Sequence, residues 1–215
     1  MTAAVITAIY ADYDVLQPAG DEPGVEWVCV TDNQSLVNDP RGWHVIYEPR
    51  HDVHPNRAAK RPKMLPWCYT GADESVWIDA SFAVTSPTFV RDVLQYADPI
   101  AQFLHPDRDC IYQEAAFSLP LPKYRGEQIA EQMAHYRAVG HPERWGLWAT
   151  GVIARKHTDA VIDFGWRWLA DCECFTYQDQ LSHAPALRAA GLRPTTLPGH
   201  FVESPWLDYR ASGRH

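Results

Sequence analysis

Short runs of apolar and β-branched residues alternate along the chain with longer segments of mixed polarity. The first three runs, over residues 3–14, 26–33 and 43–49, each close on or next to an acidic residue, which predicts strands joined by loops. The same pattern predicts further strands over 75–79 and 99–105 and within 146–157, and helices over 52–69, 86–97, 108–119, 126–140, 158–175 and 177–192. Strands that alternate with helices in this way predict an α/β fold, in which one mainly parallel central sheet is flanked by helices.

Proline, glycine and small residues set several of the expected boundaries. Pro62 lies inside the segment 52–69 and predicts a kink or a new turn there. Ser86 followed by Pro87 predicts the start of a helix, because serine caps a first turn and proline is favoured at the first helical position. Thr150 and Gly151 are expected just before a strand, where the backbone can approach a ligand closely, although a simple tight turn is equally consistent.

Length and charge narrow the class of protein. We expect the 215 residues to form a single domain over 1–215, with 210–215 as a loose tail. A formal net charge of -8 argues against duplex nucleic acid as the default partner. No apolar run approaches the roughly 20 residues that span a bilayer. The five cysteines are odd in number and show no CxxC spacing, so we expect reduced thiols and a cytoplasmic protein.

Candidate chemistry gathers at the predicted strand ends. Tyr10, Asp32, Asp79 and His105 all lie at or just after such ends, where open α/β sheets bind their ligands. A carboxylate at the end of the buried run 76–78 is costly unless a cation meets it, and Asp79 is such a carboxylate. Taken alone, an aspartate at such a position is more often a loop residue or a helix cap, so the group is better evidence than any single member.

A basic segment precedes Asp79 in the sequence. Arg57, Lys60 and Lys63 lie within the predicted helix 52–69. A divalent cation on Asp79 beside these side chains would suit a pyrophosphate-bearing substrate, because the metal and the basic groups together neutralise a leaving diphosphate. The block 105–115 adds Arg108 and Glu114, which could bind substrate hydroxyls or simply pair with each other or with neighbours.

Several sequence blocks carry a resemblance to a known family. They are "TAIYADYD", "WVCVTDN", "GWHVIYEPR", "NRAAKRPKMLPW", "SVWIDASFAV", "HPDRDCIYQEA", "QMAHYRAVGHPERWGLWATGVIARKH" and "DQLS", in this order from Thr7 to Ser182. The chain resembles a glycosyltransferase-like family, long described as a domain of unknown function. That family includes plant proteins implicated in pectin or mucilage synthesis and a member described as an alkaline ceramidase.

The resemblance implies a GT-A-like nucleotide-sugar fold with roles for particular residues. Tyr10 and Asp32 would contact the base or ribose, and Arg57, Lys60 and Lys63 the diphosphate of a donor that is most often UDP-linked. Asp79 would occupy the metal-binding DxD position, which reads Asp79-Ala80-Ser81 here, so that the neutral Ser81 is a poorer ligand for Mn²⁺ or Mg²⁺. His200 is the candidate additional metal ligand and Asp179 the candidate catalytic base. The expected substrate contacts are His105, Arg108, Glu114, Thr150, Gly151 and Gln180.

These features together predict a metal-assisted glycosyltransferase that moves a sugar from a nucleotide-diphosphate sugar to a glycan or other hydroxyl acceptor. Inverting and retaining courses both stay open, since only an inverting enzyme needs a carboxylate base. The alternatives are a hydrolase of nucleotide-sugars or of a lipid amide, and a non-catalytic sugar- or nucleotide-binding module. A modified nucleic-acid base as acceptor is a further option, against which the acidic charge counts.

Overall fold

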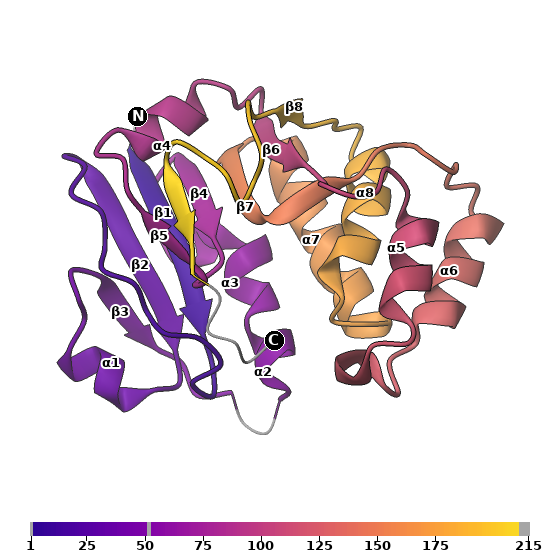
Figure 1. The fold of residues 1–215 in the computed structure, drawn as a ribbon, viewed down its shortest axis with the longest axis horizontal. Helices are drawn as coiled ribbons and strands as arrows, with labels where there is room; N and C mark the ends of the chain where they lie inside the picture. The colour runs from indigo at the N-terminus through magenta and orange to yellow at the C-terminus, as the bar shows by residue number, and fades with distance from the viewer. Residues whose placement is uncertain (1, 51–52, 211–215) are drawn as a thin grey trace.

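The computed structural model describes residues 2–50 and 53–210, and Figure 1 shows its central sheet. Seven strands pair in the order β3-β2-β1-β4-β7-β6-β8. Their bounds are β1 Ala3–Ile9, β2 Val25–Thr31, β3 His44–Tyr47, β4 Glu74–Ile78, β6 Ile100–Leu104, β7 Trp148–Lys156 and β8 Thr195–Thr196. The first four of these strands pair in parallel, as do β6 and β8, whereas β7 runs antiparallel to both β4 and β6. The predicted α/β class with a mainly parallel sheet is confirmed.

A second, two-stranded sheet joins distant parts of the chain. Strand β5 Phe82–Val84 pairs antiparallel with β9 Leu207–Tyr209, which brings the C-terminal segment beside the residues that follow β4. The helices are α1 Gln34–Asn38, α2 Pro55–Ala58, α3 Lys60–Met64, α4 Phe89–Leu94, α5 Ile111–Ser118, α6 Ile129–Ala138, α7 Asp159–Cys174 and α8 Asp179–Ala189, with 3-10 turns η1 Pro66–Cys68 and η2 Pro122–Tyr124.

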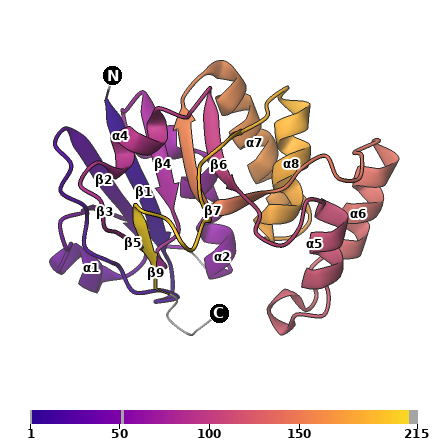
Figure 2. The ribbon, with the colours of Figure 1, turned by 45° about the horizontal axis from the view of Figure 1, so that its top comes forward.

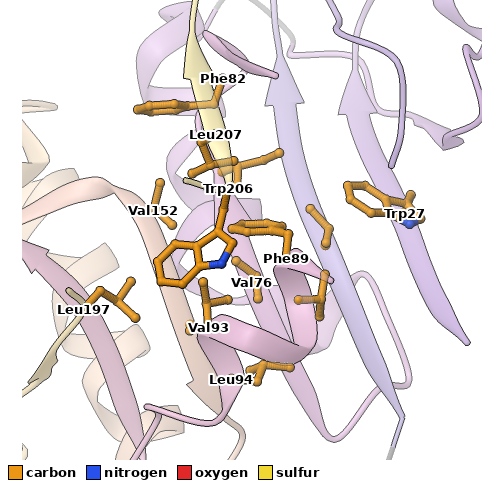
Figure 3. Packing of buried hydrophobic residues seen from close by; sticks show 14 of the residues in the cluster. Trp27, Val76, Phe82, Phe89, Val93, Leu94, Val152, Leu197, Trp206 and Leu207 are labelled. Carbon is orange, nitrogen blue, oxygen red and sulfur yellow. The ribbon is translucent and has the colours of Figure 1, made fainter. Parts of the chain in front are cut away.

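Alternating side chains of the central strands build a core on each face of the sheet. Val5 and Ile9 of β1 pack with α4, while Ala4 and Ile6 face α3, α7 and α8, as the two-residue period of a strand requires. Figure 3 shows the α4 face, where Trp206 of the C-terminal segment lies against the same cluster. A third cluster joins α5 and α6 to α8, at the end of the molecule remote from β3 (Figures 1 and 2).

The segment predicted as one helix over 52–69 is broken into α2, α3 and η1. Pro55 and Pro66 each begin an element, where the missing N–H of proline does no harm. Pro62 lies in the first turn of α3 and is tolerated there for the same reason. The sequence therefore predicted correctly that the helix is interrupted, but the interruption lies at Ala59 and not at Pro62.

Two further local expectations were wrong. The helix predicted from Ser86 begins at Phe89, with Thr88 at the N-cap position, and the Ser86 hydroxyl instead accepts the Thr88 N–H at 3.3 Å. Thr150 and Gly151 lie inside β7 rather than before a strand, because the apolar run that continues the ladder already starts at Trp148. The predicted end of the last helix near Gly191 fits α8, which has Ala190 at its C-cap and Gly191 at a positive φ of 69°.

The reversed direction of β7 decides where the site forms. Ile78 at the end of β4 pairs with Val152, and the ladder continues as the Asp79 N–H donates to the Gly151 carbonyl at 2.8 Å. On the other side of β7, the His105 N–H donates to the Leu147 carbonyl at 3.0 Å. The first residues of β7 therefore meet the last residues of β4 and β6 at the carboxyl edge of the sheet.

Three remaining expectations concern the chain as a whole. Within residues 2–50 and 53–210, no helix is both long enough and apolar enough to cross a bilayer. All five cysteines are free thiols. The predicted tail 210–215 lies outside the described residues except for Arg210, whose backbone N–H donates to the Ser81 carbonyl at 2.6 Å.

Candidate functional site

A cavity of about 200 Å³ lies at the carboxyl edge of the sheet, between α3, the end of β4 and the start of α8. We name it the lysine cavity. Its charged lining side chains are Asp14, Lys60, Lys63, Asp79, Lys123 and Asp179, and its aromatic ones are Tyr13, Trp77, Tyr124 and Tyr177. Aromatic faces next to ammonium groups are what a nucleotide requires, because the base can stack while the cations balance its phosphates.

Lys63 lies at the centre of the charged groups. Its side chain is 5% exposed, and its Nζ lies 2.8 Å from Asp179 Oδ2 and 3.3 Å from Asp79 Oδ1. The same Nζ donates to the Thr150 hydroxyl at 3.5 Å. Burial lowers the pKa of Lys63, but the carboxylates of Asp179 and Asp79 more than offset this, so the net shift is upward. Lys63 is therefore an ammonium held among three oxygen atoms.

Asp179 ties both lysines of α3 to the start of α8. Its Oδ2 also lies 2.8 Å from Lys60 Nζ, and its Oδ1 accepts the Thr150 hydroxyl at 3.2 Å. Burial raises the pKa of Asp179, but Lys60 and Lys63 outweigh it and hold the pKa well below its usual range. The N-terminus of α8 favours the carboxylate in the same direction. With both oxygens engaged and the pKa lowered, Asp179 is a weak proton acceptor.

Asp79 is the more accessible carboxylate of the cluster. Its side chain is 41% exposed, and Oδ1 accepts the Trp77 indole N–H at 2.7 Å in addition to facing Lys63. A Cβ at Gly151 would lie 3.2 Å from Asp79 Oδ2. Glycine at this position of β7 therefore keeps space open beside that oxygen.

The predicted metal ligands do not form a convincing metal site. Ser81 lines the lysine cavity as a neutral hydroxyl, and His200 is exposed, with its Nδ1 accepting the Val202 N–H at 3.3 Å. Across residues 2–50 and 53–210, no group of three His, Cys, Asp or Glu side chains gathers in a metal-binding arrangement. Because Asp79 Oδ1 already faces an ammonium and an indole N–H, the side chains present do not fit a divalent cation at this position.

A second cavity of about 290 Å³ adjoins the first. We name it the histidine cavity. It is lined by Asp79, His105, Pro106, Asp107, Arg108, Ala149, Thr150, Gly151, Gln180 and Phe201, so Asp79 and Thr150 line both cavities. Five of the six predicted substrate contacts lie here, namely His105, Arg108, Thr150, Gly151 and Gln180.

Glu114, the sixth predicted contact, does not line this cavity, but it bonds to two residues that do. Its Oε2 accepts Arg108 Nε and lies 3.5 Å from His105 Nε2, while its Oε1 accepts the Gln178 amide at 3.1 Å. The ion pair between Arg108 and a nearby acid, anticipated as a structural alternative, is confirmed. Gln180 donates to the Trp148 carbonyl at 2.5 Å, which fixes its side chain at the start of β7.

Three residues predicted to contact the nucleotide face other partners. Arg57 donates to the carbonyls of Cys172 and Phe175 and to Glu127, so it fastens α2 to the end of α7. The Tyr10 hydroxyl donates to Glu48 at 2.9 Å. Asp32 accepts the Ala11 N–H and Arg50 Nε. None of these three side chains lines the lysine or the histidine cavity.

The lysine cavity also contains residues that sequence reasoning missed. Lys123 and Tyr124 come from η2, in a stretch interpreted only as a proline-containing loop, and Tyr177 lies just before α8. The Tyr177 hydroxyl donates to the Lys123 carbonyl, which joins the two segments. The signal available in the sequence was the unusual aromatic content, with ten tyrosines, but composition does not say which tyrosines converge.

Comparison with models of known protein families identifies the family of this chain. A sequence model of the TOD1/MUCI70 family, described as a glycosyltransferase-like domain, matches residues 42–193. The chain belongs to this family. Lys60, Lys63, Asp79, Thr150 and Asp179 all fall within the matched range, whereas Tyr10, Asp32 and His200 lie outside it. The resemblance inferred from the sequence blocks is confirmed. No curated protein matches the chain.

Two solved structures were compared with the chain. The apo structure of the bifunctional glycosyltransferase WbbM is similar with a TM-score of 0.54 at 12% sequence identity, over 92% of this chain and 39% of the WbbM chain. The structure of CMP:2-keto-3-deoxy-manno-octonic acid synthetase complexed with CTP gives a TM-score of 0.47 at 16% identity, over 92% of this chain and 89% of that one. The likeness to WbbM concerns the fold alone and confirms the GT-A-like class.

Proposed function

We propose that this protein transfers a sugar from a nucleoside diphosphate sugar, UDP-linked by preference, to a hydroxyl group of a glycan or similar acceptor. The observation that carries the proposal is the pair of adjoining cavities that share Asp79 and Thr150. A transferase must hold two substrates with their reacting atoms in contact, and a shared wall of two polar side chains meets that need.

The donor is assigned to the lysine cavity. Lys60 and Lys63 each present an ammonium group there, and one of the three N–H donors of Lys60 meets Asp179 Oδ2. Those donors suit the oxygens of a diphosphate. Tyr13, Tyr124 and Tyr177 supply aromatic faces for the base or ribose. The lysine ammonium groups and the tyrosine rings of one cavity therefore both support the binding of the donor there.

The acceptor is assigned to the histidine cavity. His105, Arg108 and Gln180 offer polar groups suited to sugar hydroxyls, and Phe201 offers a flat apolar face of the kind on which sugar rings pack. Arg108 and His105 are held by Glu114, so these groups are pre-oriented rather than free to move. Pre-orientation lowers the entropic cost of binding.

The reaction would proceed at the shared wall. The acceptor oxygen bonds to the anomeric carbon, the bond from that carbon to the phosphate oxygen breaks, and the electron pair stays on the leaving diphosphate beside Lys60 and Lys63. In an inverting course the hydroxyl proton passes to a carboxylate. Asp179 was the predicted base, but its two ion pairs and lowered pKa favour a positioning role. Asp79 has the more accessible carboxylate, so it is the better candidate to accept the proton of the acceptor hydroxyl.

The test is a thermal-shift screen with UDP-, GDP-, ADP- and CMP-sugars, followed by chromatography of the reaction mixture. We expect one nucleotide class to raise the melting temperature and, with an acceptor present, to release its free nucleotide. A ligand at about 100 times its dissociation constant contributes about 2.7 kcal/mol, which is a measurable shift. Absence of any shift across the four classes would contradict the proposal.

The same assay separates the alternative functions. A nucleotide-sugar hydrolase would release free sugar and nucleotide without any acceptor. A binding module would shift the melting temperature but release nothing over long incubation. Transfer to acceptor, measured as a new glycosylated product, is the result that distinguishes the proposed transferase from both.

A further inference from the structure

The position opposite Asp79 is filled by an amino group of the chain itself. Lys63 Nζ has three oxygen neighbours, which are Asp179 Oδ2 at 2.8 Å, Asp79 Oδ1 at 3.3 Å and Thr150 Oγ1 at 3.5 Å. Two carboxylates and a hydroxyl are a set of hard oxygen atoms of the kind that Mg²⁺ or Mn²⁺ takes as ligands. The buried ammonium occupies the centre of that set.

We propose that Lys63 takes the place of a divalent cation, so that the donor diphosphate is bound and released against the ammonium groups of Lys63 and Lys60 alone. The inference rests on the proposed transferase function and specifies its cofactor requirement as none. It corrects the expectation from sequence that Asp79, Ser81 and His200 hold a metal.

Three observations support this assignment. The Lys63 side chain is 5% exposed and is bonded on several sides, so it is a fixed part of the wall rather than a mobile surface group. The Trp77 indole N–H takes a second position on Asp79 Oδ1, which leaves that oxygen poorly available to a metal. Lys60 adds a second ammonium at the same oxygen of Asp179, Oδ2, so two positive charges meet the cavity where one divalent ion would otherwise supply them.

The first experiment measures nucleotide binding to the whole chain with and without metal. UDP, GDP, ADP and CDP are titrated by calorimetry in EDTA and again in Mn²⁺. We expect the nucleotide that binds to show the same dissociation constant in both buffers to within about twofold. Tightening of tenfold or more by Mn²⁺ would overturn the inference and leave the proposed function standing. If none of the four binds in either buffer, the proposed function itself fails.

The second experiment uses manganese alone as the probe and needs no nucleotide. Free Mn²⁺ is counted by electron paramagnetic resonance in the presence of the wild-type chain, of Lys63→Ala and of Lys123→Ala. Lys63→Ala removes the ammonium from among the three oxygens, so we expect this variant to bind one Mn²⁺ while the wild type binds none. Lys123 is an exposed lysine of the same cavity, and Lys123→Ala is expected to behave like the wild type.

Two outcomes of this experiment would overturn the inference. One is tight Mn²⁺ binding by the wild-type chain, which needs no variant to be observed. The other is a folded Lys63→Ala variant, verified by circular dichroism, that binds no Mn²⁺, because the Nζ position would then not be a cation site.

Discussion

Arg155 on β7 is the least expected side chain of the core. It is fully buried, and none of its three side-chain nitrogens has a hydrogen-bond partner within residues 2–50 and 53–210. Burial lowers its pKa to about 9, which still leaves the guanidinium charged at neutral pH. Burial is the main cause that lowers the pKa of His183, and the charges of Lys63 and Arg155 lower it further. An unpaired buried charge is costly, so Arg155 is expected to lower the stability of the fold.

Arg155→Met is therefore expected to stabilise the protein. Methionine has a similar length and no charge, so the free energy of unfolding at pH 7 should rise by about 1–3 kcal/mol, measured by urea denaturation. Arg167→Met is the matched control, because Arg167 is an exposed arginine on α7 whose ion pair with Asp163 should contribute less than about 1 kcal/mol. A marked loss of stability in Arg155→Met would mean that the guanidinium has a stabilising partner.

Individual site residues were predictable where charge and position coincide. Lys60, Lys63 and Asp79 followed from a basic segment placed just before an acid at a strand end. Arg57 belongs to the same segment, but it donates to carbonyls at the end of α7 instead of lining the lysine cavity. Spacing along the sequence does not show which partner each basic side chain meets, so it could not distinguish Arg57 from Lys60 and Lys63.

At the scale of elements, the contact between α3 and α7 decides where the two lysines lie. Gly165 of α7 faces α3, and a Cβ there would lie 2.4 Å from the Met64 carbonyl and 2.5 Å from the Trp67 ring. Met64 is the last residue of α3, the helix that carries Lys60 and Lys63. The absence of a side chain at Gly165 therefore lets the lysine-bearing helix lie directly against α7.

Gly165→Ala is expected to damage both stability and the site. The new methyl group must push α3 away, which should cost roughly 1–3 kcal/mol of unfolding free energy and weaken nucleotide binding, since Lys60 and Lys63 move with the helix. Gly71→Ala is the control, because a Cβ at Gly71 meets nothing within 4 Å. Denaturation and calorimetry on both variants provide the measurements, and unchanged nucleotide binding in a destabilised Gly165→Ala would separate the two effects.

The elements themselves were largely predictable, but their pairings were not. Helix α7 was expected over 158–175 and lies at Asp159–Cys174, because Thr158 caps it and its apolar face is regular. A strand within 146–157 was expected, but its antiparallel direction was not, and that direction is what carries Thr150 to Asp79. Strand β9 escaped prediction because a three-residue strand has too few positions to show a period.

At the scale of the whole molecule, two buried histidines and one half-buried histidine make stability depend on pH. Burial is the main cause that lowers the pKa of His183 to about 3 and the pKa of His141 and His157 to about 4. The unfolded chain binds protons on these residues near pH 6.5, whereas the folded chain does not. Stability is therefore complete above pH 6.5 and falls as the pH drops towards 4.

We expect the free energy of unfolding to fall between pH 7.5 and pH 5 by roughly 1–2 kcal/mol for each of these histidines. Urea denaturation at several pH values measures the slope. His183→Leu should flatten it, because the imidazole is fully buried beside Phe164 and Trp168 with no hydrogen bond to other described residues. A slope unaffected by that substitution would assign the acid sensitivity to other groups.

The four central charges of the site, on Lys60, Lys63, Asp79 and Asp179, cancel within a few ångströms, whereas the chain as a whole carries a formal charge of -8. At long range, these four charges therefore exert no net attraction on an anionic molecule that approaches the lysine cavity, while the negative charge of the rest of the protein repels it. A nucleotide-sugar must therefore diffuse against a weak electrostatic repulsion, and dissolved salt weakens this repulsion by screening the charges. Association should accordingly quicken as ionic strength rises, the reverse of the behaviour of proteins that draw phosphates in from afar.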